Sequence, residues 1–210
     1  MLKFKIWIMQ RFYRVGLWWW KWWSLLYRFL FHRKYKKVDL DSYLTPFEVQ
    51  TKLDKLTWTK DGTRELWDSC GSPHWVQYVL GEIKKTNSQP EGALDCDDFT
   101  SWAAAVIEPG YNPRIFSFTW VGRTFDTRPG DLAQVKKIQG HAMCLLARKD
   151  TGQLFHVGNW GVSSSCSDLH SLCLDIMTRA NGTQAIGWAL MDKKLNVLDY
   201  GTGMPDKGIK

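Results

Sequence analysis

Three short segments hold side chains whose types and order suit one kind of chemistry. They are DCDDF at 95–99, GHAM at 140–143 and GNWG at 158–161. Cys96 supplies a thiol, His141 follows 45 residues later with an imidazole, and Asn159 follows 18 residues after that with an amide oxygen. A nucleophile, a base and a group that orients the base form a catalytic triad. The order therefore predicts a Cys-His-Asn thiol enzyme.

Cys96 lies where a polar loop should become a helix. The stretch DDFTSWAAAVIE after it has helical character, and Pro109-Gly110 should end that helix. The positive end of a helix dipole stabilises a thiolate, and the small side chains of residues 103–105 would let the helix approach a sheet closely. The alternative for Cys96 is a buried structural cysteine.

His141 begins a predicted strand, which would hold its side chain rigidly enough for a general base. Asn159 belongs to the strand expected to pair with it, where its oxygen can fix the imidazole tautomer. Trp160 can shield that hydrogen bond from water. Taken singly, His141 can equally be a core histidine, and Asn159 a turn residue beside Gly158 and Gly161.

The pattern along the chain predicts helices followed by antiparallel strands. Apolar spacing indicates helices over 46–56 and 74–86, then the helix that starts at Cys96. Strands are expected over 114–122, 141–148 and 153–160, a short helix from Ser167 to Thr178, and a final hairpin over 184–192 and 194–200. This order predicts an α+β domain, with the nucleophile helix packed on the sheet.

The basic charge of the chain is concentrated at its N-terminus. Residues 1–37 carry ten Lys/Arg, no Asp or Glu, and six of the 13 Trp. The other 18 Lys/Arg accompany 21 Asp/Glu, so the rest of the chain has a net charge of −3. We therefore expect no nucleic-acid-binding body.

Residues 1–37 are interpreted as a basic, Trp-rich segment at a membrane interface. Lys21 and Arg28 interrupt its apolar runs, so it fits neither a spanning helix nor a signal peptide well. Trp prefers the interface and Lys/Arg bind anionic headgroups, which favours an amphipathic helix over 3–32 on an anionic surface. A tail that packs on a partner or binds nucleic acid, and a tilted span, are the alternatives. A linker over 38–45 and one domain over 46–210 follow.

The five cysteines do not form the pattern of a secreted disulfide framework. We therefore expect a reducing, cytoplasmic location, with the protein associated with the membrane. A competing interpretation is a structural zinc site. Its ligands would be Cys166, His170 and Cys173, with Cys144 as the fourth, although this spacing matches no standard pair of zinc knuckles.

The DCDDF and GHAM motifs resemble the transglutaminase-like cysteine proteinases of bacteria, within the papain-like superfamily. The resemblance covers about residues 45–162. It implies a helix carrying the cysteine, packed on a sheet that carries the histidine and its partner. It also implies amide chemistry through a thioester, usually proteolysis. Those proteinases commonly use Asp in the third position, whereas Asn159-Trp160-Gly161 is similar to papain-type enzymes.

The acidic residues around the cysteine call for an explanation, since like charges disfavour a thiolate. Members of the resembled family bind calcium through acids that flank the cysteine, so the resemblance implies Asp95 and Asp97 as calcium ligands. Capping of the helix by Asp95 is the alternative. For the oxyanion, the candidates are the backbone N–H of Cys96 and the side chains of Gln89, Gln77 and Trp75.

Together these patterns predict a membrane-associated thiol hydrolase, of the cysteine peptidase type, that acts on a protein or peptide substrate. Hydrolysis and transfer to an amine are both open outcomes for the thioester. The alternative is a catalytically inactive module of the same fold, anchored to a membrane or partner by residues 1–37.

Overall fold

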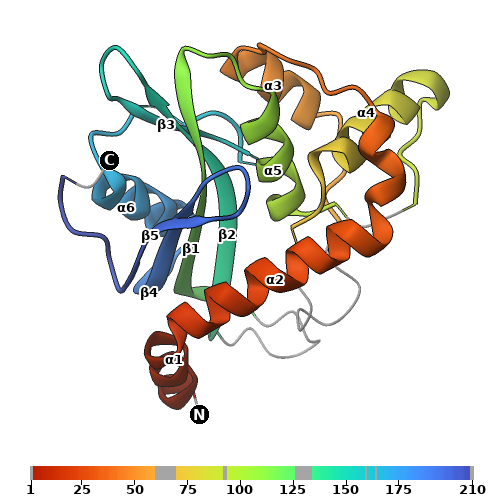
Figure 1. Ribbon diagram of the computed structural model, residues 1–210. Helices are drawn as coiled ribbons and strands as arrows, with labels where there is room; N and C mark the ends of the chain where they lie inside the picture. The colour runs from red at the N-terminus through yellow and green to blue at the C-terminus, as the bar shows by residue number, and fades with distance from the viewer. Residues whose placement is uncertain are drawn as a thin grey trace.

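The computed structural model describes residues 2–59, 70–91, 94–125, 134–158, 160–163 and 165–208. These ranges contain one five-stranded antiparallel sheet with helices on both faces (Figure 1). The predicted α+β class, with helices preceding an antiparallel sheet, is confirmed.

The sheet is built around one long hairpin. Strands β1 (Tyr111–Phe125) and β2 (Gln134–Arg148) pair along their full length, and the spatial order is β3-β2-β1-β4-β5. The other strands are β3 (Leu154–Val157), β4 (Gly182–Met191) and β5 (Val197–Thr202). β1 and β2 extend beyond the predicted 114–122 and 141–148, whereas β3 is shorter than the predicted 153–160.

Alternation along the strands gives the sheet two different faces. One face, here the α5 face, carries Ile115, Cys144 and Leu146 and packs on α3 (Pro46–Leu53), α4 (Pro73–Thr86) and α5 (Cys96–Val106). The other, the α6 face, packs its aromatic β1 side chains and Met143 on α6 (Leu169–Arg179). All four helices lie where the sequence pattern predicts them.

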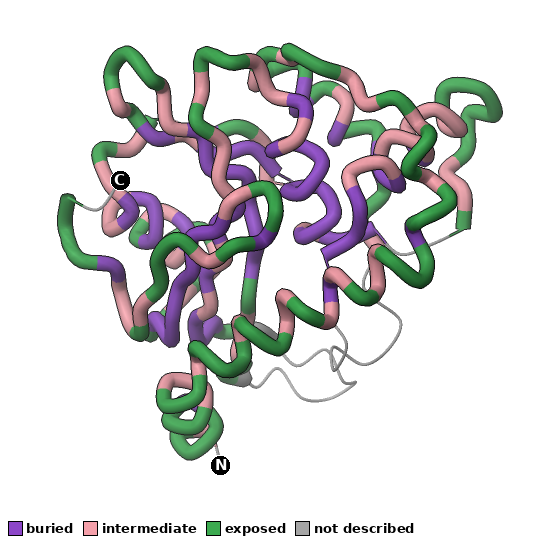
Figure 2. Tube along the Cα trace, in the orientation of Figure 1, coloured by how far each residue is buried: buried purple, intermediate pink, exposed green. Residues whose placement is uncertain are grey.

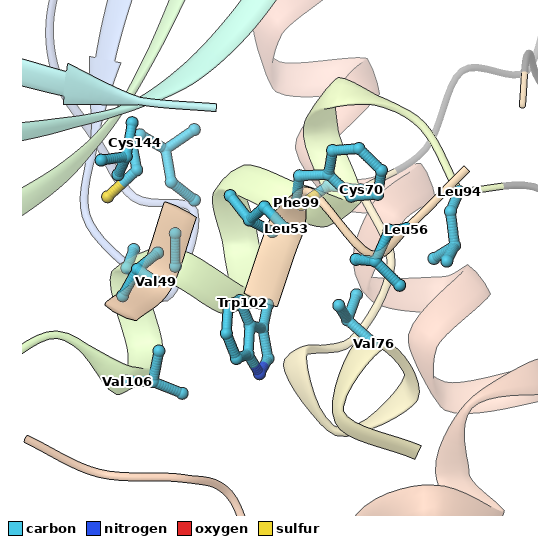
Figure 3. Packing of buried hydrophobic residues seen from close by; sticks show 14 of the residues in the cluster. Val49, Leu53, Leu56, Cys70, Val76, Leu94, Phe99, Trp102, Val106 and Cys144 are labelled. Carbon is cyan, nitrogen blue, oxygen red and sulfur yellow. The ribbon is translucent and has the colours of Figure 1, made fainter. Parts of the chain in front are cut away.

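Helix α5 is the centre of the larger core. Nine of its eleven residues are buried, so helices and sheet enclose it on nearly all sides. Phe99 and Trp102 lie among side chains from α3, α4 and β2, including Leu53, Val76 and Cys144 (Figure 3). Burial of these aromatic rings supplies the apolar contact that fixes α5 against the sheet.

The N-terminal segment is helical and lies along the domain. It consists of α1 (Leu2–Arg11), α2 (Tyr13–Phe31) and a 3₁₀ helix over Arg33–Lys37. The prediction of one continuous helix over 3–32 is wrong at Phe12, whose φ of −111° and ψ of 17° interrupt the helical backbone. Figure 1 shows α2 crossing the molecule from the ends of β1 and β2 toward α4.

Helix α2 turns Ser24 toward the domain and three of its tryptophans outward. Ser24 is fully buried, whereas Trp18, Trp19 and Trp22 are each more than half exposed. Figure 2 shows the same contrast between a mostly exposed α2 and the buried α5. Among the described residues, no helix is both long and apolar enough to cross a bilayer.

We predict that Gly71→Ala lowers the free energy of unfolding by about 1–3 kcal/mol, because an added Cβ would overlap the Asp98 carboxylate. The matched control is Gly81→Ala in α4, where a Cβ meets nothing within 4 Å, and helix propensity should add up to about 1 kcal/mol. Urea unfolding followed by circular dichroism measures both. Equal stability of the two variants would contradict the close packing at Gly71.

Candidate active site

Cys96 occupies the first position of α5, as predicted. Asp95 is the N-cap, and its Oδ1 accepts hydrogen bonds from the backbone N–H groups of Asp97 (3.0 Å) and Asp98 (3.4 Å). The Asp98 side chain accepts in return from the Asp95 backbone N–H, which completes a capping box. This cap fixes where the helix begins and holds the half-buried Cys96 thiol at its positive end.

The thiol lies against an open edge of the sheet. Strand β3 pairs with β2 only from Cys144 onward, so the earlier part of β2 has no described strand on that side. The Ala142 N–H, just before the pairing starts, donates to the Cys96 Sγ at 3.5 Å. A backbone donor aimed at sulfur favours the thiolate, and this contact places the thiol against the β2 backbone one residue after His141.

His141 is buried, and its ring stacks on Trp160 with centroids 4.2 Å apart and planes 20° from parallel. Burial lowers the pKa of His141 to about 3, and the nearby charge of His156 acts in the same direction. Its Nε2 is buried and accepts no hydrogen bond from any described residue. The imidazole is therefore neutral near neutral pH, and in this buried state it accepts a proton less readily than an exposed histidine.

The third predicted member of the triad, Asn159, lies outside the described residues. Its neighbours form a turn, because the Gly161 N–H donates to the Gly158 carbonyl at 3.0 Å and Gly161 has a φ of +87°. Trp160 is the part of this segment that contacts the site, through its stacking on His141.

The acids around Cys96 have contacts at the helix terminus, and the calcium ligands implied by the resemblance, Asp95 and Asp97, stay a prediction. Asp95 Oδ1 is the cap acceptor, and Asp98 Oδ1 accepts from the Gly71 N–H at 2.6 Å. The Cys96 thiol points toward Asp97 Oδ1 at 3.8 Å. No three His, Cys, Asp or Glu side chains in the described ranges converge as a metal site.

The residues predicted as zinc ligands do not come together. Cys144 is buried on the α5 face and Cys173 on the α6 face, so the sheet separates them. His170 Nδ1 instead contacts the Pro205 carbonyl at 2.8 Å. All five cysteines, each within the described part of the chain, are thiols rather than disulfides.

The side chains proposed for the oxyanion are engaged elsewhere. The Gln89 amide bonds at both ends to the backbone of Thr57. Gln77 Oε1 accepts from Trp102 Nε1 at 2.8 Å, and Trp75 stacks on His32. None of these three lines the cavity described below. The backbone N–H of Cys96 is the sequence-based candidate that belongs to the site itself.

A cavity of about 1290 Å³ contains the thiol and the imidazole. Its floor is the part of the α5 face that α5 leaves uncovered, its end is the N-terminus of α5, and its roof is the junction of α1 and α2. The lining includes Cys96, His141 and Trp160 together with Phe12, Tyr13, Gly16, Leu17 and Trp20. Sequence reasoning missed this roof, although Tyr13, Leu17, Trp20, Ser24 and Arg28 recur at helical spacing.

The C-terminal half of α2 is hydrogen-bonded to residues 70–72, which precede α4. Ser24 Oγ accepts from the Cys70 N–H, and Arg28 donates to the Cys70 carbonyl (both 3.0 Å). Arg28 also reaches Ser101 of α5 at 2.9 Å, and His32 Nδ1 accepts from the Ser72 N–H at 3.0 Å. The segment that roofs the cavity is thus bonded to the helix that carries the nucleophile.

Tyr13 holds the N-terminal end of α2 against the sheet. Its hydroxyl is hydrogen-bonded to Thr119, and its ring packs where a Cβ on Gly187 would lie. Burial raises the pKa of Tyr13 far above its usual value, so the phenol is neutral. α2 therefore keeps its place over the cavity by contacts at both ends.

We predict that the protein loses stability in mild acid. Burial lowers the pKa of His32 and His156 to about 4 and that of His141 to about 3. Each folded pKa lies below the unfolded value of about 6.5, so the unfolded chain binds more protons in between, and stability falls as pH drops through this window. The three together should cost on the order of 6 kcal/mol at about pH 5.

Urea unfolding between about pH 5 and about pH 7.5 measures this slope. His32→Asn should flatten it, because Asn retains an acceptor for the Ser72 N–H without titrating. Identical slopes for the wild type and this variant would exclude His32 as a contributor.

No family model, curated protein or solved structure matches this chain.

Proposed function

We propose that Cys96 and His141 are the nucleophile and general base of a thiol hydrolase that acts on an amide carbonyl. The observation that carries the proposal is the Ala142 N–H donating to the Cys96 Sγ, because it sets the thiol at a helix N-terminus against the β2 backbone one residue after the histidine. A half-buried thiol, a neutral buried imidazole and a shared cavity support it further.

The reaction begins with transfer of the Cys96 proton to His141. The thiolate attacks the amide carbonyl carbon, and the backbone N–H of Cys96 is the donor toward the developing oxyanion. As the C–N bond breaks, the imidazolium returns its proton to the departing amine, which leaves a thioester on Cys96. Water, deprotonated by His141, then releases the acid; an amine in its place would give transfer.

The likeness to transglutaminase-like cysteine proteinases is part of this proposal. It is supported by a cysteine at the start of a helix, an antiparallel sheet that carries the histidine, and a tryptophan stacked on that histidine. Asn159 is the proposed orienting residue. A peptide or protein amide is the substrate that this likeness favours.

One observation favours the alternative, an inactive binding module. The Cys96 thiol is directed toward the Asp97 carboxylate, which disfavours the thiolate that catalysis needs. Thiol reactivity separates the two functions directly.

We expect a thiol-directed electrophile at neutral pH to label Cys96 at least about tenfold faster than Cys166. Cys166 is the matched control, because it is also half-buried, and burial together with the charge of Asp175 raises its pKa. Labelling of Cys96 should fall to the Cys166 rate in His141→Gln, and cleavage of peptide amides by roughly 100-fold or more. Peptide mapping by mass spectrometry measures each rate.

A Cys96→Ser variant that folds like the wild type should lack both labelling at this position and hydrolysis. Equal labelling of the two cysteines in the wild type, unchanged in His141→Gln, would rule out the activated pair and support the binding module.

We further propose that α1 and α2 dock on an anionic membrane surface. The outward face of α2 exposes a row of large apolar side chains, which water solvates poorly: Val15, Trp18, Trp19, Trp22, Leu26, Phe29 and Leu30. Ten Lys/Arg and no acidic residue in residues 1–37 match anionic headgroups. Tryptophan at the level of the headgroups is the preferred location of this residue type.

In flotation with phosphatidylglycerol vesicles, we expect the double variant Trp18→Ser, Trp22→Ser to bind at least about tenfold more weakly than the wild type. Phe47→Ser is the control, because Phe47 of α3 is 77% exposed and lies outside this face. Raised salt should also weaken wild-type binding. Unaltered binding of the double variant would reject this surface.

A further inference from the structure

The cavity at Cys96 is a long groove whose walls are mostly apolar. Its floor presents Ile115, Ala142 and Met191 from three strands, and its roof presents Phe12, Leu17 and Trp20 from the α1–α2 junction. At about 1290 Å³ it exceeds the range of roughly 300–1,000 Å³ typical of small-molecule sites. The groove therefore has room for a group that extends well beyond the reacting carbonyl.

The polar groups on the groove side of α2 are already used within the protein. Tyr13 lines the groove and bonds to Thr119 of its floor. A peptide backbone packed against the Leu17 and Trp20 side of α2 would lose hydrogen bonds to water that these apolar side chains do not replace. An alkyl chain has no such groups to satisfy, so it suits these walls better.

The roof of the groove is also the element with the membrane-facing surface. α2 exposes Trp18, Trp19 and Trp22 outward and covers the groove with Leu17 and Trp20 on its other side. An alkyl chain that leaves a bilayer docked on the outward face of α2 would therefore pass around this one helix to reach the groove. Its exposure to water on the way is short, which lowers the cost of transfer.

Resting on the proposed function, we propose that the substrate is an N-acyl amphiphile drawn from an anionic membrane, with its long acyl chain in the groove and its amide at Cys96. The thiolate attacks the acyl carbonyl carbon, the C–N bond breaks, and the polar amine leaves with the proton held by His141. The acyl chain is then a thioester of Cys96. Water adds to the thioester carbonyl, the C–S bond breaks, and a free fatty acid leaves as the thiol is restored.

A series of N-acyl aminocoumarins, from acetyl to dodecanoyl, tests the substrate class with the full-length protein. Each methylene that the groove buries should raise kcat/KM roughly threefold, so dodecanoyl should exceed acetyl by on the order of 100-fold or more. Phosphatidylglycerol vesicles that carry the dodecanoyl substrate should give faster turnover than phosphatidylcholine vesicles that carry the same substrate.

Gly16→Phe locates the chain in the groove. Gly16 lines the roof, and a Cβ there meets nothing within 4 Å, so the side chain of Phe can start toward the groove without a clash at Cβ. The ratio of dodecanoyl to acetyl turnover should fall at least tenfold relative to the wild type. Gly81→Phe on α4 is the matched control, because it also meets open space and lies outside the groove, and it should leave the ratio unchanged.

These experiments distinguish failure of the acyl-chain inference from failure of the proposed thiol hydrolase. Hydrolysis of peptide or acetyl amides through Cys96 with no preference for long chains would overturn the acyl-chain inference and leave the thiol hydrolase intact. A preference for dodecanoyl over acetyl substrates that persists unchanged in Gly16→Phe would also overturn this inference, since the acyl chain would then bind outside the groove. No hydrolysis of any amide, with Cys96 labelled no faster than Cys166, would overturn the proposed function itself.

Discussion

The buried carboxylate of Asp98 is the point on which the rest of the site depends. It is 5% exposed, accepts the Gly71 N–H at 2.6 Å, and closes the capping box through the Asp95 N–H. These two bonds set where α5 begins and attach that beginning to the polypeptide that precedes α4. Buried charges need such partners, because an unpaired carboxylate in this position would cost several kcal/mol. The place of Cys96 against the sheet follows from this attachment.

The same polypeptide carries the contacts of α2, so the nucleophile and the roof share one support. Arg28 donates hydrogen bonds to Cys70 of that polypeptide and to Ser101 of α5. Its positive charge lowers the pKa of the Cys70 thiol, whereas the charges of Asp97 and Asp98 raise it. Burial nevertheless dominates and raises the pKa of Cys70 to about 12. A positive side chain from the N-terminal segment thus offsets the acidic terminus of α5, a relation that neither segment reveals alone. The segment with the extreme composition is bound into the domain.

Much of the fold could be predicted, because its signals are local. Asp95 followed three residues later by Asp98 marks a helix start, and the alternation in β1 and β2 separates two faces. The roof could not be predicted this way, since the usual rule assigns the apolar side of a helix to the core. Helix α2 instead buries Ser24 and partly buries Arg28 while it exposes Trp18, Trp19 and Trp22. The oxyanion candidates failed for a related reason: the spacing of Gln89 from Cys96 carries no information about Thr57, the residue it bonds.

The shortness of β3 has a consequence for how such a site arises. Strand pairing uses every backbone donor along an edge, and β3 stops opposite Cys144, two residues after Ala142. A longer β3 would place its own carbonyl where the sulfur now accepts the Ala142 N–H. The thiol thus takes a position that sheet formation leaves vacant, and the helix terminus covers an edge that could otherwise template pairing with another chain. The length of one strand, rather than the identity of the cysteine alone, decides whether this fold presents a nucleophile or simply a larger sheet.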